Sequence, residues 1–214
     1  MFKILDEEKP EYLTVTFDVH APTFRHEMFA DYKGTRKPMA EELRQQVPVI
    51  KDVLRAMHIE VIEKAGLEAD DLLGTLSHRC EEKGMDVSII SGDRDTLQLA
   101  TEHIKIRIPK TKQGKTEVED YYAADVQERY GVTPKEFIDV KALMGDTADN
   151  IPGVPGVGEK TATKIIQQYQ TIENAYEHVD ELKPPRASKE SRKNSGNRHS
   201  LVRLLRQLNR TQIL

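Results

Sequence analysis

Short apolar runs alternate with amphipathic helical patterns through the first half of the 214-residue chain, and this alternation constrains the fold more than any other feature. Strands are expected at residues 12–18, 59–63, 86–91 and 104–109, and helices at 41–57 and 68–83. This order is typical of a mostly parallel sheet, because each crossover helix returns the chain to begin another parallel strand. The sequence therefore predicts an α/β fold with helices flanking a central sheet.

The pattern changes in the second half of the chain. Thr133, Pro134 and Glu136 form a capping box with proline in the first turn, which predicts a helix to about Met144. A Gly/Pro-rich hairpin follows at 153–158, and a second helix is expected at about 159–169. We therefore predict three regions, which are an α/β domain at 1–125, a helix-hairpin-helix subdomain at 126–183 and a basic tail at 184–214.

Charge is distributed unevenly along the chain. The net charge is −4, but residues 183–214 hold nine Lys or Arg and one Glu, so the remainder carries −12. The tail also carries an amphipathic stripe formed by Leu201, Leu204, Leu205 and Leu208. An acidic body repels nucleic acid unless cations neutralise its carboxylates, so the placement of the acids decides which functions are possible.

Composition argues against a membrane or secreted protein. No apolar run approaches the roughly 18 residues that a membrane span needs. Acidic residues at 6–8 stand where a signal peptide would continue its apolar stretch, and Cys80 is the single cysteine. We expect a cytoplasmic protein in which Cys80 packs as a small apolar residue of a helix rather than acting as a nucleophile.

Four groups of acids lie at or just beyond the ends of predicted elements, where α/β folds place their chemistry. One such group is more often a helix cap or a turn. Four such groups together indicate a bound cation. Gathered carboxylates repel one another, which raises their pKa values and destabilises the fold unless a cation lies among them. Hard oxygen donors without His or Cys favour Mg²⁺ or Mn²⁺, and two ions about 3.5 to 4 Å apart suit phosphodiester hydrolysis. The four groups are Asp18; Glu68, Asp70 and Asp71; Asp93 and Asp95; and Asp146 and Asp149.

Two basic features complement the acids. Tyr32, Lys33 and Arg36 offer an aromatic ring for base stacking and two cations for a phosphate, although alone they suit a solvated basic face. The hairpin glycines let the backbone approach a phosphate, and the N–H groups of the next helix form an anion site that positions a duplex without reading its sequence. An ordinary turn is the alternative. Lys160 and Lys164 add possible phosphate contacts.

Four segments together resemble the motif series of the 5′ nuclease, or flap endonuclease, family, and are most similar to the 5′ to 3′ exonuclease domains of bacterial DNA polymerases I. They are residues 32–36, 68–71, 91–95 and 143–162, and the likeness extends over about residues 1–183. The resemblance implies a helical arch over the active site and a helix-hairpin-helix unit that grips duplex DNA, often with a monovalent cation such as K⁺.

The resemblance also implies roles for individual residues. The eight acids would serve two metal ions, Lys33 and Arg36 would act as catalytic residues on the scissile phosphate, and Arg25 and Tyr32 would bind the 5′ region of the substrate. The hairpin and the helix after it would contact DNA through Gly153, Val154, Gly156, Val157, Gly158, Lys160 and Lys164.

The chain departs from the family pattern at both ends. The family opens with a central strand ending in a metal-binding Asp followed by Gly and Asn, whereas Met1–Leu5 resembles the helix after it. Without that strand, unpaired backbone groups are expected in the sheet. Resemblance stops near Pro184, and we hypothesise an incomplete or shifted reading frame at both ends, which the upstream genomic sequence would test.

Three functions are compatible with these features. The first is metal-dependent hydrolysis of DNA at 5′ ends and flaps during replication and repair, by a monomer. The second is a module of the same fold that binds branched DNA but cleaves it poorly. The third is a Mg²⁺-dependent phosphatase, which would need a nucleophilic Asp early in the chain and leaves the hairpin unexplained.

Overall fold

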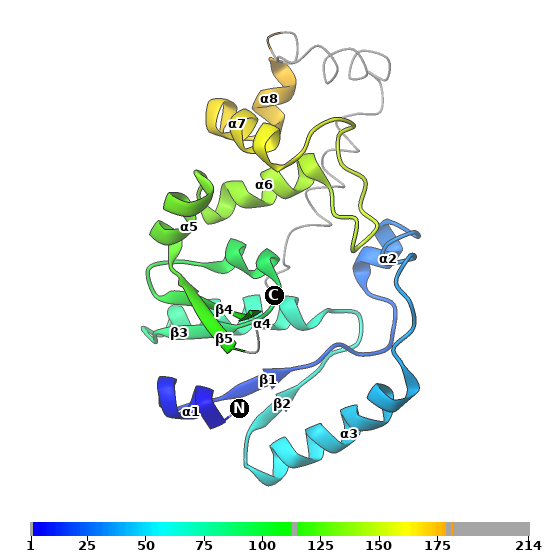
Figure 1. The fold of residues 1–214 in the computed structure, drawn as a ribbon, viewed down its shortest axis with the longest axis vertical. Helices are drawn as coiled ribbons and strands as arrows, with labels where there is room; N and C mark the ends of the chain where they lie inside the picture. Colours follow the sequence, from blue (N-terminus) through cyan, green and yellow to red (C-terminus); the bar gives the residue numbers. More distant parts are fainter. Residues whose placement is uncertain (1, 113–114, 179–180, 182–214) are drawn as a thin grey trace.

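The computed structural model describes residues 2–112, 115–178 and 181, so the basic tail and its leucine stripe lie outside the described residues. Within those ranges, no helix combines the length and apolar character needed to cross a bilayer. Helices and strands alternate through the first half, which confirms the α/β class (Figure 1). In chain order the elements are α1 (Phe2–Glu8), β1 (Thr14–Thr16), α2 (Phe24–Met28), α3 (Glu41–Ala56), β2 (Glu60–Ile62), α4 (Ala69–Glu81), β3 (Val87–Ile90), η1 (Arg94–Leu99), β4 (Ile104–Lys112), β5 (Lys115–Tyr121), α5 (Ala123–Tyr130), α6 (Pro134–Met144), α7 (Glu159–Tyr169) and α8 (Ile172–Glu177).

The strands form two small sheets rather than one continuous sheet. β1 pairs in parallel with β2, whereas β3 pairs in parallel with β4, which pairs antiparallel with β5. Among the described residues no ladder joins β1 to β3, although α4 contacts both strands. The predicted sheet is thus divided at its middle, with α4 linking the two parts.

Most predicted elements are present with shifted ends. The helix predicted at 68–83 is α4, which begins one residue later because Glu68 is its N-cap, and Gly84 turns the chain after it at φ +77°. Cys80 lies half-buried on α4 as a free thiol. The sequence missed β5, because five of its seven residues are polar and its apolar pattern is correspondingly weak.

The core joins the three-stranded sheet to the helical half of the chain. Ile104 and Ile106 of β4 are fully buried, as are Leu97 of η1, Val126 of α5 and Ile166 of α7. All five belong to one cluster of buried side chains, which includes residues from β3 to α8. This packing fixes the loop after α6 relative to the end of β3, where two groups of acids meet.

Helix α6 begins at a capping box and ends in a loop that two glycines close. The predicted capping box is confirmed, since Thr133 Oγ1 accepts from Glu136 N at 3.2 Å and the Glu136 carboxylate accepts from Thr133 N at 2.8 Å. At the other end of α6, a Cβ on Gly145 would lie 2.3 Å from Gly153 N, and Gly145 adopts φ +73°. The end of α6 and the segment at Gly153 can therefore approach this closely only because Gly145 and Gly153 both lack a side chain.

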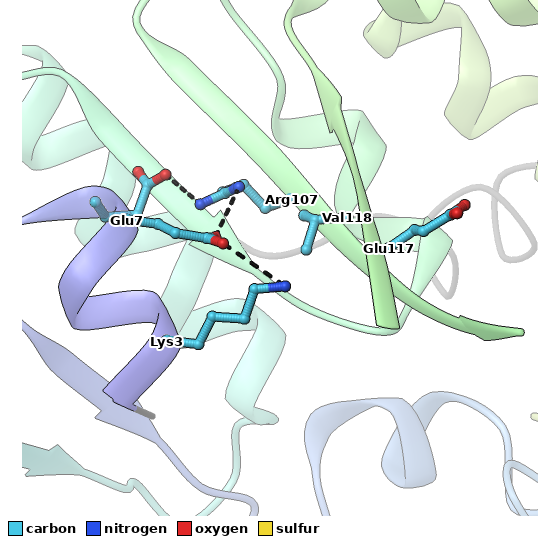
Figure 2. Close-up of a pocket in the computed structure, with 6 residues that line it drawn as sticks. Lys3, Glu7, Arg107, Glu117 and Val118 are labelled. Atoms are coloured by element: carbon cyan, nitrogen blue, oxygen red, sulfur yellow. Dashed lines mark hydrogen bonds and ion pairs between the residues drawn. The ribbon is translucent and has the colours of Figure 1, made fainter. Parts of the chain in front are cut away.

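Helix α1 is held by ion pairs rather than by apolar burial. It has no buried residue. Arg107 of β4 pairs with Glu7 at 3.4 Å and also with Glu8 (Figure 2). Lys105 of β4 lies 3.2 Å from Glu8. A polar pocket of about 540 Å³ lies between α1 and the β4–β5 ribbon. None of its lining residues belongs to the predicted site, and we assign the pocket no function.

Candidate active site

The acids after β1, β3 and at the start of α4 face one another. Asp18 accepts a hydrogen bond from Ala69 N at 2.7 Å, which ties the end of β1 to the first turn of α4. Burial, together with the charges of Asp93, Asp18 and Glu68, raises the pKa of Asp70 to about 7. Three groups of acids that are far apart in the sequence are therefore close enough in space to repel one another.

The turn at residues 31–36 links Glu68 to the loop after α6. The Tyr32 hydroxyl lies 3.0 Å from carboxylate oxygens of both Glu68 and Asp149. Lys33 Nζ is 2.6 Å from Glu68, and Arg36 pairs with Asp149. Tyr32 is only 3% exposed, so its ring is a packing element, in contrast to the exposed stacking platform that the sequence predicted.

Lys141 links the acids after β3 to those after α6, a role that no motif in the sequence predicted. Its Nζ lies 2.9 Å from Asp95 and 2.8 Å from Asp146. Burial raises the pKa of Asp95 to about 6, with Asp93 and Asp146 adding to the shift and Lys141 opposing it. For Asp146, burial is outweighed by Lys141 and two backbone N–H groups, so its pKa is lowered.

Arg25 and Asp71 form a buried pair away from solvent. Arg25 donates to both carboxylate oxygens of Asp71, at 2.8 and 2.9 Å, and the two residues are 4% and 0% exposed. Asp71 also accepts from Glu68 N at 3.0 Å as part of the α4 capping box. From the sequence, Arg25 was expected to contact the substrate and Asp71 to bind a metal, but both residues are buried, where they join α2 to α4.

The donor set fits a hard divalent cation in chemistry, since it consists of carboxylate oxygens without His or Cys. In the described part of the chain, no three of these groups converge closely enough to hold an ion without moving. Lysine and arginine side chains already contact several of these acids, among them Glu68, Asp149 and Asp95. A cation would compete with Lys33, Arg36 and Lys141 for these carboxylate oxygens.

The hairpin presents backbone groups rather than charged side chains. Gly156 turns the chain at φ +78°, and Gly158 is the N-cap of α7 with open space around its Cα. Val157 is 6% exposed and Val154 packs against the core, so these two residues anchor the turn from inside. Gly153 is packed against the end of α6. The two predicted contact residues on α7 with long cationic side chains, Lys160 and Lys164, are both exposed.

The chain is similar in sequence to known families and to individual proteins. Residues 1–131 match the family model of the 5′-3′ exonuclease N-terminal resolvase-like domain, and residues 132–213 match that of the 5′-3′ exonuclease C-terminal SAM fold. The DNA polymerase I of Bacillus caldotenax is 49% identical over 181 residues, which cover 85% of this chain and 20% of that protein. The enzyme of Bacillus subtilis (strain 168) is 46% identical over 182 residues, with the same shares. The chain thus spans about a fifth of the length of these relatives.

Solved structures show the same fold at lower identity. A T5 5′-exonuclease with bound zinc superposes with a TM-score of 0.80 at 23% identity, covering 97% of this chain and 77% of that one. The catalytic core of Rad2 in complex with DNA gives 0.58 at 18% identity, covering 93% and 64%. With both family models matched in order along its sequence, the chain belongs to the 5′-3′ exonuclease family.

Proposed function

We propose that this protein is a metal-dependent 5′ nuclease that hydrolyses DNA phosphodiesters at 5′ ends and flaps during replication and repair, acting as a monomer in the bacterial cytoplasm, close to the nucleoid. One observation carries the proposal. Three links, through Ala69 N, Tyr32 and Lys141, bring four separate groups of acids to one place beside two further cations. A phosphatase needs no hairpin, so the glycine turn before α7 favours a nucleic-acid substrate.

Seven acids would share two Mg²⁺ or Mn²⁺ ions, while Asp71 stays paired with Arg25 and orients Glu68. The ions would supply an activated water and counter-charge for the leaving oxygen. Divalent charge would also relieve the repulsion that raises the pKa values of Asp70 and Asp95. The seven proposed ligands, some of which would bind through water, are Asp18, Glu68, Asp70, Asp93, Asp95, Asp146 and Asp149.

Lys33 and Arg36 would bind the scissile phosphate. Both lie on the turn that contacts Glu68 and Asp149, with side chains 20% and 50% exposed, so they can exchange a carboxylate for a phosphate oxygen. A phosphate is a strong acceptor for both cations, and Arg36 can bind it through two N–H groups. These two residues would hold and orient the reacting group without transferring a proton.

The hairpin would grip the duplex away from the scissile bond. The first N–H groups of α7 have no side-chain cap, because Gly158 is the N-cap residue. They can bind a backbone phosphate at the positive end of the helix dipole, and Lys160 and Lys164 on the same helix would add contacts. We further propose that a K⁺ ion bridges the hairpin and the phosphate.

A labelled 5′-flap duplex tests the proposal. We expect cleavage near the junction that needs Mg²⁺ or Mn²⁺ and stops in EDTA, and weaker action on a covalently closed circular duplex, which has no 5′ end. Binding without cleavage would favour the DNA-binding module instead. Hydrolysis of p-nitrophenyl phosphate with no action on DNA would favour the phosphatase.

A further inference from the structure

Lys141 occupies the space between two proposed metal ligands. It projects from the last turn of α6, and its ammonium contacts Asp95 at 2.9 Å and Asp146 at 2.8 Å. The three side chains are 16%, 25% and 18% exposed, so water screens these contacts only in part. Adjacent residues on α6, Val140 and Ala142, are buried and fix the base of the lysine.

The oxygens of Asp146 are divided between two kinds of partner. Oδ1 accepts from Ala148 N at 2.8 Å and from Asp149 N at 3.3 Å, which holds the carboxylate in the loop. Oδ2 accepts from Lys141, on the side that faces Asp95. A divalent ion held by both carboxylates would compete with the ammonium for Asp95 Oδ1 and Asp146 Oδ2, the oxygens that Lys141 now contacts.

We propose that Lys141 is a positioning residue that acts as a displaceable counter-ion, bridging Asp95 and Asp146 until a divalent cation binds and then withdrawing toward solvent. The inference rests on the proposed function, because it concerns the same acids. A lysine suits this role, since its single compact charge is carried on a flexible stem. Arg25 differs, because its two-pronged contact with the fully buried Asp71 leaves it no route outward.

The exchange has a definite consequence for metal affinity. An ion that binds Asp95 and Asp146 must break the contacts of Lys141, so its affinity measured in solution is lower than the carboxylates alone would give. In return, the two acids are compensated when metal is scarce, which keeps the loop after α6 in place. Lys141 therefore lowers the affinity for metal, and it holds the loop after α6 in place when no metal is bound.

Manganese titration of a neutral variant tests the exchange. Lys141→Met keeps the unbranched stem of the side chain, which is one atom shorter, and removes its charge. Lys110→Met removes a matched ion pair with Glu119, 2.6 Å long, on the β4–β5 ribbon. By calorimetry without DNA, we expect Lys141→Met to bind Mn²⁺ roughly tenfold more tightly, since charge-assisted hydrogen bonds no longer oppose entry. Lys110→Met should match the wild type. Equal or weaker binding by Lys141→Met would overturn the inference.

Labelling of the unaltered protein tests it without a variant. Lysines are acetylated by a small amine-reactive ester with and without Mn²⁺, and modification of Lys141 and Lys110 is quantified by mass spectrometry. We expect Mn²⁺ to increase labelling of Lys141 several-fold and to leave Lys110 unchanged. Unchanged or reduced labelling of Lys141 in protein that binds Mn²⁺ overturns the inference alone. If neither wild type nor Lys141→Met binds Mn²⁺, the proposed metal site fails together with the inference.

Discussion

The acid site and the glycine hairpin solve the problem of binding a charged substrate in opposite ways. The acid site gathers side chains from β1, α4, η1 and the loop after α6, and several of these acids contact Lys33, Arg36 or Lys141. The hairpin uses consecutive residues, with glycine at Gly156 and Gly158 leaving the backbone accessible. Concentrated charge therefore needs compensation from distant parts of the fold, whereas exposed N–H groups need only a local chain path.

A second contrast lies inside the acid site. Arg25 and Asp71 are buried and bind each other through two hydrogen bonds, so they fasten α2 to α4. Lys33, Arg36 and Lys141 are more exposed and contact their acids at the surface of the site. Position relative to solvent, rather than charge, separates the cations that hold the fold together from those that can exchange partners.

Loss of Asp93 should separate catalysis from binding and have the largest effect. Asp93→Ala removes an exposed carboxylate that acts on Asp70 and Asp95, so we expect cleavage of a 5′ flap to fall by about 1,000-fold or more. Duplex affinity, measured by fluorescence anisotropy in Ca²⁺, should change less than about threefold. Asp86→Ala, which removes another exposed acid, is the control. Equal loss of binding and cleavage in Asp93→Ala would erase the distinction between the two regions.

Removal of Arg25 should destabilise the fold rather than weaken DNA binding alone. Arg25→Met leaves the carboxylate of Asp71 buried without its two-pronged partner, and we expect the free energy of unfolding to fall by about 3 to 5 kcal/mol. Arg36→Met breaks a more exposed pair and should cost less than about 1 kcal/mol. Urea denaturation measures both. Similar losses in the two variants would show that burial does not separate these cations.

A bulky residue at the start of α7 should weaken binding at every sequence alike. A Cβ on Gly158 would have no atom within 4 Å and its φ is −98°, so Gly158→Val should fold normally. Its side chain would block a phosphate, and we expect about tenfold weaker binding to two duplexes of unrelated sequence. Gln168→Val, at an exposed position farther along α7, is the control. A loss restricted to one duplex would contradict backbone recognition.

The smallest expected effect is on the pH dependence of folding stability, measured in EDTA so that no metal is bound. Asp70 and Asp95 have pKa values of about 7 and about 6 in the folded protein, above the ordinary value of 3.8, so the folded state holds more protons than the unfolded state between these limits. Their contribution to stability is therefore present below about pH 4 and is lost as pH rises to about 7. Asp70→Asn should be more stable than wild type at pH 7.5 by about 1 kcal/mol, after allowance for solvent screening, and equal to it near pH 4.

Urea denaturation at several pH values measures this difference. Glu102→Gln, which neutralises an exposed acid between β3 and β4, should follow the wild type at each pH. A constant difference between Asp70→Asn and wild type would mean that the acids do not repel one another. The acid site would then need no compensation of charge from distant residues, and it would not differ from the hairpin in this respect.

The sequence by itself determined the features that depend on neighbouring residues. Helical periodicity located α3, α4 and α7, the Thr133–Glu136 capping box located the start of α6, and the glycine spacing located the hairpin. The four groups of acids were also visible, because each lies at or just beyond one end of an element that the sequence defines. Such signals need only a few consecutive residues and the geometry of one helix or turn.

Tertiary structure alone decided how the charges are paired. Arg25 meets Asp71 across 46 residues, and Tyr32 meets Asp149 across 117, so no local pattern shows that these side chains are in contact. The division of the sheet between β1 and β3 and the bridge made by Lys141 likewise depend on packing between distant elements. The physical reason is that burial and Coulomb interaction depend on distance in space, which the order of residues fixes only after the chain has folded.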